Sequence, residues 1–285
     1  MKRLGVVAKP DAAEAAGALR TLAGWAARGG LPLLVEKEAA DLAPDLHLTA
    51  ARRADLPTQV DLLVVLGGDG TLLSMARAVG DLGIPIVGVN LGGLGFLTAT
   101  TLDQMVPALE AFLRGELVIE ERMMLATRVR RDSEAVGTWL ALNDAVITKA
   151  AMSRIINLAV SVEGRYATAY RADGLIISTP TGSTAYSLSA GGPILYPTMD
   201  GIVLTPICSH TLTNRPIVVP GTHRVEVTLL TPQEVMLTID GQVGVPLRER
   251  DVVEVGRAPS AIRLVRFPQQ HFFSVLRTKL KWGER

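Results

Sequence analysis

The sequence predicts two domains, a doubly wound α/β domain followed by a mainly antiparallel β domain. Its length of 285 residues exceeds the usual size of a single domain. Residues 1–118 alternate short apolar runs with helical patterns, whereas residues 119–265 carry runs rich in Val, Ile and Thr. Residues 266–285 are predicted to form a helical tail that packs back on the first domain.

Four apolar runs predict the strands of the α/β domain, at 4–8, 31–36, 60–66 and 84–90. None of them has a polar alternate face, which is typical of parallel strands covered by helices on both sides of the sheet. A less regular stretch around Pro44 and Pro57 separates the second run from the third. The pattern indicates a Rossmann-like arrangement.

Helical patterns lie between these strands. The Ala-rich stretch 11–28 follows the first run, and residues 71–79 follow the third. Thr101 and Gln104 have the spacing of a capping box, which predicts a further helix that begins there and ends near Arg114.

The β domain is predicted from runs in which apolar and polar residues alternate. These runs are 125–130, 138–148, 156–164, 224–230 and 235–243. Asp240-Gly241 is typical of a hairpin turn. Residues 178–194 are rich in small and hydroxyl residues and predict a short helix, and the spacing in 271–282 predicts a terminal helix.

Composition excludes several classes of function. The formal net charge of +1 provides no field for nucleic acid, and Cys208 is the only cysteine, which excludes an intrachain disulfide. The four histidines are scattered, and Cys208 with His210 lacks further partners for a protein-held metal site. No signal-like N-terminus and no apolar stretch of roughly 18 residues is found, so we expect a cytoplasmic protein without membrane contact.

Gly67-Gly68-Asp69-Gly70-Thr71 directly follows a predicted strand and precedes a helical pattern. Glycines at the carboxyl edge of a parallel sheet let the backbone approach a phosphate at a helix N-terminus. A carboxylate there would repel phosphate unless it binds a metal or faces the attacking hydroxyl, so Asp69 is a candidate general base. The alternative is a tight turn in which Asp69 or Thr71 caps the helix. No Walker A lysine is present.

Two further motifs are less specific. The glycines at 92, 93 and 95 follow the strand 84–90 and would lie on the same sheet edge, where they could help to cradle phosphate or only turn the chain. Asn143-Asp144 is unusual inside a strand and could bind a ribose or an amide, although a turn at a strand end is the simpler interpretation.

Residues 173–189 place seven Ser and Thr side chains, together with Tyr186, around a Pro/Gly turn that leads into the short helix. Such hydroxyls suit recognition of a polar ligand, and the alternative is a helix cap made by Ser183 or Thr184. Gln242 has no independent functional signal.

In this order and at these separations, GGDGT, Asn143-Asp144 and the segment 173–194 resemble the NAD kinases of bacteria. GGDGT alone is shared with diacylglycerol and sphingosine kinases and is close to a motif of phosphofructokinases. The long hydroxyl-rich segment resembles the NAD kinases in particular. The resemblance spans residues 4 to about 275.

The resemblance implies that Asp69 accepts the proton from the 2'-hydroxyl of the adenosine ribose of NAD while that oxygen attacks the γ-phosphorus of ATP, giving NADP and ADP. NAD contacts are implied for Asp69, Gly70, Asn143, Asp144, Arg154, Arg171, Asp173, Thr184, Ala185, Tyr186, Ser187, Leu188, Ser189 and Gln242. Contacts to the phosphates of ATP are expected from Gly67, Gly68, Thr71 and Arg77. A divalent metal, Mg²⁺ or Mn²⁺, would arrive on ATP, and a homodimer or homotetramer is expected.

Two alternatives stay open at this point. A lipid kinase of the diacylglycerol or sphingosine type would share the GGDGT turn but would need access to a membrane. A non-catalytic dinucleotide sensor would keep the pocket without turnover. The sequence does not decide the range of phosphoryl donors, whether NADH is accepted, or feedback by NADP.

Overall fold

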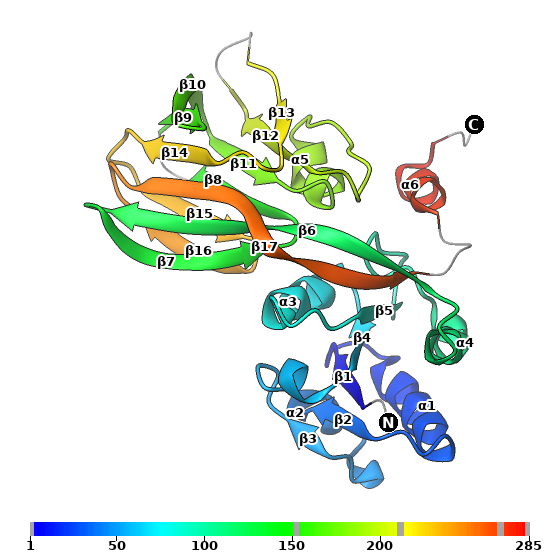
Figure 1. The fold of residues 1–285 in the computed structure, drawn as a ribbon. Helices are drawn as coiled ribbons and strands as arrows, with labels where there is room; N and C mark the ends of the chain where they lie inside the picture. Colours follow the sequence, from blue (N-terminus) through cyan, green and yellow to red (C-terminus); the bar gives the residue numbers. More distant parts are fainter. Residues whose placement is uncertain (1–2, 151–153, 210–213, 267–270, 283–285) are drawn as a thin grey trace. The chain divides into compact units, whose positions relative to one another are not determined.

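A computed structural model describes residues 3–150, 154–209, 214–266 and 271–282 (Figure 1). His210, considered above with Cys208, lies outside these ranges. The chain divides into two compact units. Unit 1 comprises Met1–Glu121 and Ile262–Arg285, and unit 2 comprises Arg122–Ala261.

The centre of unit 1 is a parallel sheet, as predicted. Its strands are β1 (Leu4–Ala8), β2 (Leu33–Glu36), β3 (Ala50–Ala51), β4 (Leu62–Gly67) and β5 (Ile86–Asn90). They are arranged in the order β5-β4-β1-β2-β3. Leu264, near the end of β17 (Val252–Arg266), pairs in parallel with Ile86 on the other side of β5.

Helices cover both faces of this sheet, which confirms the doubly wound fold. The helices are α1 (Ala15–Arg28), α2 (Lys37–Ala40), α3 (Asp69–Val79) and α4 (Leu102–Leu113). Alternate residues of β4 point to opposite faces, and Leu62, Val64 and Leu66 pack with α1 and α4 on one of them. On the opposite face, Leu72 of α3 lies directly over Gly88 of β5. Figure 1 shows α3 and α1 on opposite sides of the strands.

Most predicted elements of unit 1 are present with small shifts. The first helix begins at Ala15 rather than at residue 11, and the expected capping box of Thr101 and Gln104 is formed. The stretch around Pro44 and Pro57 is more regular than predicted. It contains α2, β3 and two 3-10 helices, Pro44–Leu46 and Leu56–Gln59, which are too short to leave a periodic pattern.

Unit 2 is built from antiparallel strands, as the sequence predicted, and these strands form two sheets. The first has the order β10-β9-β14-β17-β6-β7, formed by β6 (Val118–Arg131), β7 (Glu134–Ala141), β9 (Ile156–Val162), β10 (Arg165–Ala172), β14 (Val225–Leu229) and β17. The second has the order β13-β12-β11-β8-β15-β16, formed by β8 (Asp144–Lys149), β11 (Gly174–Ser178), β12 (Gly201–Ile207), β13 (Ile217–Pro220), β15 (Val235–Ile239) and β16 (Val243–Leu247).

The two sheets enclose one core. Inward residues from the first sheet, such as Leu158 and Val255, pack with inward residues from the second, such as Ile147 and Leu237. Polar or small residues occupy the outward positions between them, so the alternation seen in the sequence follows the pleat of each strand.

Three local predictions in the second half of the sequence have different outcomes. The run 138–148 is not one strand, because Leu142 and Asn143 turn the chain between β7 and β8. Asp240-Gly241 is a hairpin turn between β15 and β16, with φ of 49° and 64°. The hydroxyl-rich segment holds a 3-10 turn, Gly182–Thr184, and the short helix α5 (Tyr186–Ser189).

The predicted terminal helix is α6 (Phe272–Leu280), in which Val275 and Leu276 are buried. No helix in the described part of the chain is both long enough and apolar enough to cross a membrane.

Candidate active site

The order of strands in unit 1 reverses between β1 and β4. The chain runs outward from β1 to β2 and β3, and then crosses to β4 and β5 on the other side of β1. In open α/β sheets, ligands bind beyond the carboxyl ends of the strands at such a reversal. Lys9 follows β1 at this point, and Gly68-Asp69 follow β4.

Asp69 is the first residue of α3, with Gly68 as N-cap, and its side chain does not cap the helix. Its carboxylate instead reaches the loop after β5. Oδ2 accepts the Phe96 N–H at 2.9 Å. Oδ1 accepts the Leu97 N–H, the Thr98 N–H and the Thr98 hydroxyl, each at 3.0 Å.

This arrangement leaves acceptor capacity on one oxygen. A carboxylate oxygen offers about two lone pairs. Among the described residues, Oδ1 of Asp69 already receives three donors, whereas Oδ2 receives one. Oδ2 therefore keeps room for one more hydrogen bond, of the kind that a substrate hydroxyl would donate.

The two glycine clusters meet at Asp69, as their common sheet edge predicted. A Cβ on Gly95 would overlap Asp69 Oδ1 and Thr98 Oγ1, so this close approach requires glycine. Asn90 holds the same loop: its side chain donates to the Gly93 carbonyl at 2.8 Å and accepts from the Gly92 N–H at 2.6 Å.

The other residues of the GGDGT motif have different surroundings. A Cβ on Gly67 would lie 2.7 Å from Thr71 Oγ1, whereas a Cβ on Gly68 would meet nothing within 4 Å. Gly70 is exposed in the first turn of α3. Arg77 lies in the last turn, about 12 Å along the helix axis from Asp69. The structure thus brings Gly67, Gly68 and Thr71 close to Asp69 and places Arg77 at the other end of the helix.

In unit 2, Asp240 holds the turn that carries Asn143 and Asp144. Asp240 is buried in the β15–β16 turn, and its carboxylate accepts three backbone N–H groups. Oδ1 takes those of Asn143 at 2.8 Å and Asp144 at 3.2 Å, and Oδ2 takes that of Leu142 at 3.2 Å. Asp240, which the sequence analysis interpreted only as a turn residue, therefore fixes the backbone conformation of the candidate binding turn at Asn143 and Asp144.

Asp144 is buried, with only 4% of its surface exposed. Burial, with a smaller contribution from the negative charge of Asp240, raises the pKa of Asp144 from 3.8 to about 7. The carboxyl group is therefore partly protonated near neutral pH, so it is able both to donate and to accept hydrogen bonds.

Most hydroxyls of the segment 173–189 support the backbone. Thr179 Oγ1 donates to the Leu142 carbonyl at 2.6 Å, and Ser183 Oγ donates to the Pro180 carbonyl at 2.6 Å. Ser187 is fully buried, and its hydroxyl lies 2.9 Å from that of Thr205. These hydroxyls stabilise the turn through the backbone carbonyls, which is a structural role different from the helix cap that the sequence offered as the alternative for Ser183 or Thr184.

The other residues predicted to contact NAD in this part of the chain are more exposed than those buried hydroxyls. Thr184 donates to the Thr181 carbonyl at 3.2 Å. Ala185 and Leu188 are half-buried, whereas Tyr186 and Ser189 are exposed. Gln242 is exposed in the β15–β16 turn, two residues after Asp240.

Arg154 and Arg171 line one cavity of about 510 Å³ in unit 2. Lys149 and Asn157 line it as well, and Lys149 Nζ lies 3.7 Å from Asp173 Oδ1. The two predicted arginines thus line one basic cavity, whose volume is typical of small-molecule sites, and Asp173 reaches it only through its ion pair with Lys149.

Three residues with a place in these sites were not predicted. Lys9 and Thr98 lie beside the GGDGT motif, and Asp240 holds the Asn143 turn. Lys9 lies one residue beyond β1, where the order of strands reverses. Its position near a ligand site can therefore be inferred only when the strand order is known. Thr98 contacts Asp69, which is 29 residues away in sequence, and Asp240 contacts Asn143, which is 97 residues away. No local sequence pattern reveals such contacts.

Comparison with known proteins identifies the family of this chain. The ATP-NAD kinase N-terminal domain family matches residues 4–117, and the ATP-NAD kinase C-terminal domain family matches residues 142–267. The NAD kinase of Geotalea daltonii is 50% identical over 289 residues, with all of both chains covered. The NAD kinase of Solibacter usitatus is 48% identical over 286 residues, with 100% of this chain and 99% of the relative covered.

Solved structures have the same fold. The crystal structure of yeast NADH kinase complexed with NADH matches with a TM-score of 0.91 at 25% identity, covering 100% of this chain and 89% of the yeast chain. An NAD kinase from Archaeoglobus fulgidus in complex with ATP matches with a TM-score of 0.78 at 24% identity, covering 98% of each chain. These matches do not support the lipid kinase alternative. The chain belongs to the ATP-NAD kinase family of enzymes.

Proposed function

We propose that this enzyme transfers the γ-phosphate of ATP to the 2'-hydroxyl of the adenosine ribose of NAD, giving NADP and ADP, with Asp69 as the general base. The observation that carries the proposal is the fixed carboxylate of Asp69 at the reversal of the sheet. Four donors from Phe96, Leu97 and Thr98 hold it, and Oδ2 keeps one acceptor position. A substrate hydroxyl bound there would be oriented for attack and for loss of its proton.

The phosphates of ATP are proposed to lie along Gly67, Gly68 and Thr71 at the N-terminus of α3. The open space above Gly68 favours close approach of a phosphate, and the helix dipole favours its negative charge. Lys9 is exposed beside this turn, and no side-chain partner is present for it in the described part of the chain. Arg77 lies at the far end of α3, about 12 Å along the helix axis from this turn.

The NAD contacts are proposed in unit 2. The turn at Asn143 and Asp144 offers an amide and a partly protonated carboxyl group to ribose hydroxyls. The basic cavity at Arg154 and Arg171 suits an anionic part of the dinucleotide, since guanidinium groups bind phosphate in a bidentate manner. The ligands of the related structures, NADH and ATP, support dinucleotide and triphosphate substrates.

A divalent cation is proposed to arrive bound to ATP. Kinases of this kind generally use one, and it would neutralise charge on the phosphoryl group in transfer. The residues around Asp69 are better suited to bind a metal–triphosphate complex than to bind the metal directly. Three hydrogen-bond donors occupy Oδ1 of Asp69, and in this proposal the open position of Oδ2 receives the substrate hydroxyl rather than the metal.

The test compares wild-type protein with Asp69→Asn, using NAD, ATP and Mg²⁺ and detecting NADP with an NADP-specific dehydrogenase. Loss of a general base is expected to lower kcat by about 10²–10⁴-fold. NAD binding, measured by calorimetry, should persist in the variant.

Thr98→Val is the matched control. It removes one hydrogen bond to Asp69 Oδ1 and keeps the carboxylate, so its kcat should fall far less. Equal activity of wild type and Asp69→Asn would remove Asp69 as the base and leave the kinase activity intact. Tight NAD binding by wild type without any NADP would favour the dinucleotide-sensor alternative.

A further inference from the structure

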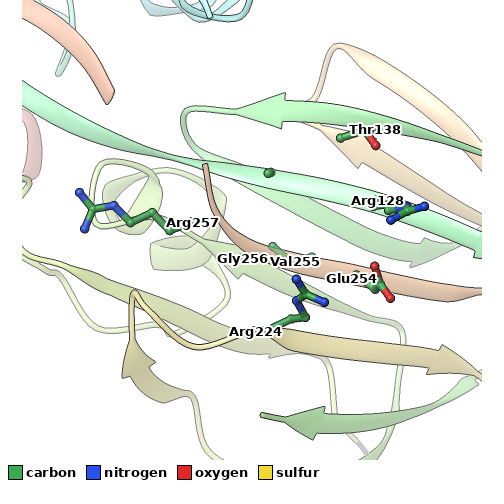
Figure 2. Close-up of a pocket in the computed structure, with 8 residues that line it drawn as sticks. Arg128, Thr138, Arg224, Glu254, Val255, Gly256 and Arg257 are labelled. Carbon is green, nitrogen blue, oxygen red and sulfur yellow. The ribbon is translucent and has the colours of Figure 1, made fainter. Parts of the chain in front are cut away.

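A second cavity lies on the outward face of the first sheet of unit 2, apart from the residues assigned to NAD or ATP. Strands β6, β7 and β17 and the residue before β14 line it, and its volume is about 320 Å³. Figure 2 shows the side chains that surround it. This volume is at the lower end of the range of small-molecule sites, which suits a compact ligand.

The cavity is strongly cationic. Arg128, Arg224 and Arg257 line it, and Glu254 is the only acidic residue of the lining. Glu254 is already paired with Arg130, a neighbour outside the lining, at 2.5 Å. Arg257 is paired with Asp200 at 2.9 Å, and in Figure 2 its side chain points away from the other two arginines.

The guanidinium groups of Arg128 and Arg224 form no ion pair and no side-chain hydrogen bond among the described residues, although the Glu163 carboxylate accepts the backbone N–H of Arg224 at 2.6 Å. In Figure 2 both lie next to Glu254, whose charge Arg130 neutralises. The cavity therefore holds two positive charges in excess, each with a planar donor fork available.

One residue of the cavity lining, Gly256 of β17, leaves space for a ligand because it has no side chain. A Cβ built there would meet nothing within 4 Å. Thr138, paired with Arg128 across β6 and β7, adds a hydroxyl at the edge. An anion seated over Gly256 would have two guanidinium groups and one hydroxyl as hydrogen-bond donors.

We propose that this cavity binds a small phosphate-bearing anion at a site separate from those for NAD and ATP. Phosphate oxygens match the guanidinium fork in bidentate geometry, and charge-assisted hydrogen bonds of this kind are the stronger ones. The outward face of the sheet places the anion in reach of solvent, so exchange with free ligand is direct.

The experiment measures pyrophosphate binding by calorimetry at low salt, with the full-length protein. Because the ATP site also binds phosphates, the comparison rests on variants that change only this cavity. The double variant Arg128→Gln/Arg224→Gln removes both free charges, and Gly256→Leu fills the space over Gly256. Arg165→Gln, an exposed arginine of β10 with no side-chain partner among the described residues, is the matched control.

Wild type and Arg165→Gln should bind pyrophosphate at one more site than the two cavity variants do. If the variants keep that site, their dissociation constant for pyrophosphate there should be at least tenfold higher than that of wild type. Crystals soaked in selenate should show an anomalous peak over Gly256 in wild type and none there in the double variant. Thermal unfolding checks that each variant is folded. Identical isotherms for wild type and both cavity variants, or an empty cavity after soaking, would overturn the proposal. Assays of NADP formation are separate, so failure here leaves the proposed kinase reaction untouched.

Discussion

Lys9 and Asp69 stand at the ends of two adjacent parallel strands, β1 and β4, and carry opposite charges. Asp69 is held by the loop after β5, whereas Lys9 is exposed and has no side-chain partner in the described residues. A triphosphate beside a fixed carboxylate needs nearby cations to offset repulsion. The unpaired lysine at the sheet reversal is suited to that role.

Replacing Lys9 with Gln should therefore weaken ATP binding more than NAD binding. The loss of one charged hydrogen bond corresponds to about a tenfold rise in the KM for ATP. Initial rates at varied ATP and at varied NAD measure both constants. Lys37→Gln, which alters an exposed lysine of α2 in the same unit, should leave both constants unchanged. A KM for ATP that does not move in Lys9→Gln contradicts the assignment.

At the scale of elements, the β15–β16 hairpin fixes the turn between β7 and β8 through the carboxylate of Asp240. Asp240→Asn keeps a residue that tolerates the left-handed φ of 49° but places an amide N–H₂ opposite the N–H of Leu142. We expect the free energy of unfolding to fall by about 1–3 kcal/mol and the KM for NAD to rise. Denaturant titration and initial rates measure the two effects.

Asp132→Asn is a matched control for this variant. Asp132 also lies in a hairpin turn at a φ of 48°, but no side-chain hydrogen bond holds it among the described residues. Asp132→Asn should change neither the free energy of unfolding nor the KM for NAD. Equal behaviour of the two variants would mean that the contacts of Asp240 do not stabilise the turn.

Asp144 makes stability depend on pH. Its pKa is about 7 in the folded protein and near 3.8 when exposed, so between these values the folded state binds more protons than the unfolded state. The contribution of Asp144 to the free energy of unfolding therefore declines as pH rises through this window, by about 4 kcal/mol at most, and the decline levels off above a pH of about 7. Below a pH of about 3.8 the contribution is unchanged.

Asp144→Asn removes this titration. Relative to wild type, its free energy of unfolding should be higher at a pH of about 8 than at a pH of about 5, as measured by urea unfolding at both values. A constant difference between the two proteins across this range would contradict the raised pKa. The comparison with wild type cancels the titration of groups that do not interact with Asp144.

Local patterns predicted these elements well where the determining residues are close in sequence. The Thr101–Gln104 capping box, the Asp240-Gly241 turn and the parallel strand β4 were all predicted. A turn at Asn143 was the simpler interpretation of the sequence, but the carboxylate that stabilises it could not be identified, because it lies 97 residues away. Similarly, the hydroxyl of Ser187 is directed inward by Thr205, a partner that only the folded chain supplies.

At the scale of the whole molecule, the division of the chain into units predicts how fragments behave. Unit 2 is one continuous segment, Arg122–Ala261, with its own sandwich core. Unit 1 combines the first 121 residues with the segment from Ile262 onward, and Leu264 from that segment covers the edge of β5 at Ile86. Removing the second segment exposes a parallel strand with an apolar sequence at the sheet edge.

Expressed alone, residues 122–261 should therefore unfold cooperatively, because their core needs no other part of the chain. Residues 1–121 alone should aggregate, since the unpaired edge of β5 offers free N–H and C=O groups beside apolar side chains. Joining residues 262–285 to them through a flexible linker should restore a soluble, folded unit, because the linker returns Leu264 to β5. Circular dichroism, thermal unfolding and light scattering distinguish these states. A soluble, cooperatively unfolding fragment 1–121 would show that β5 does not need its C-terminal neighbour.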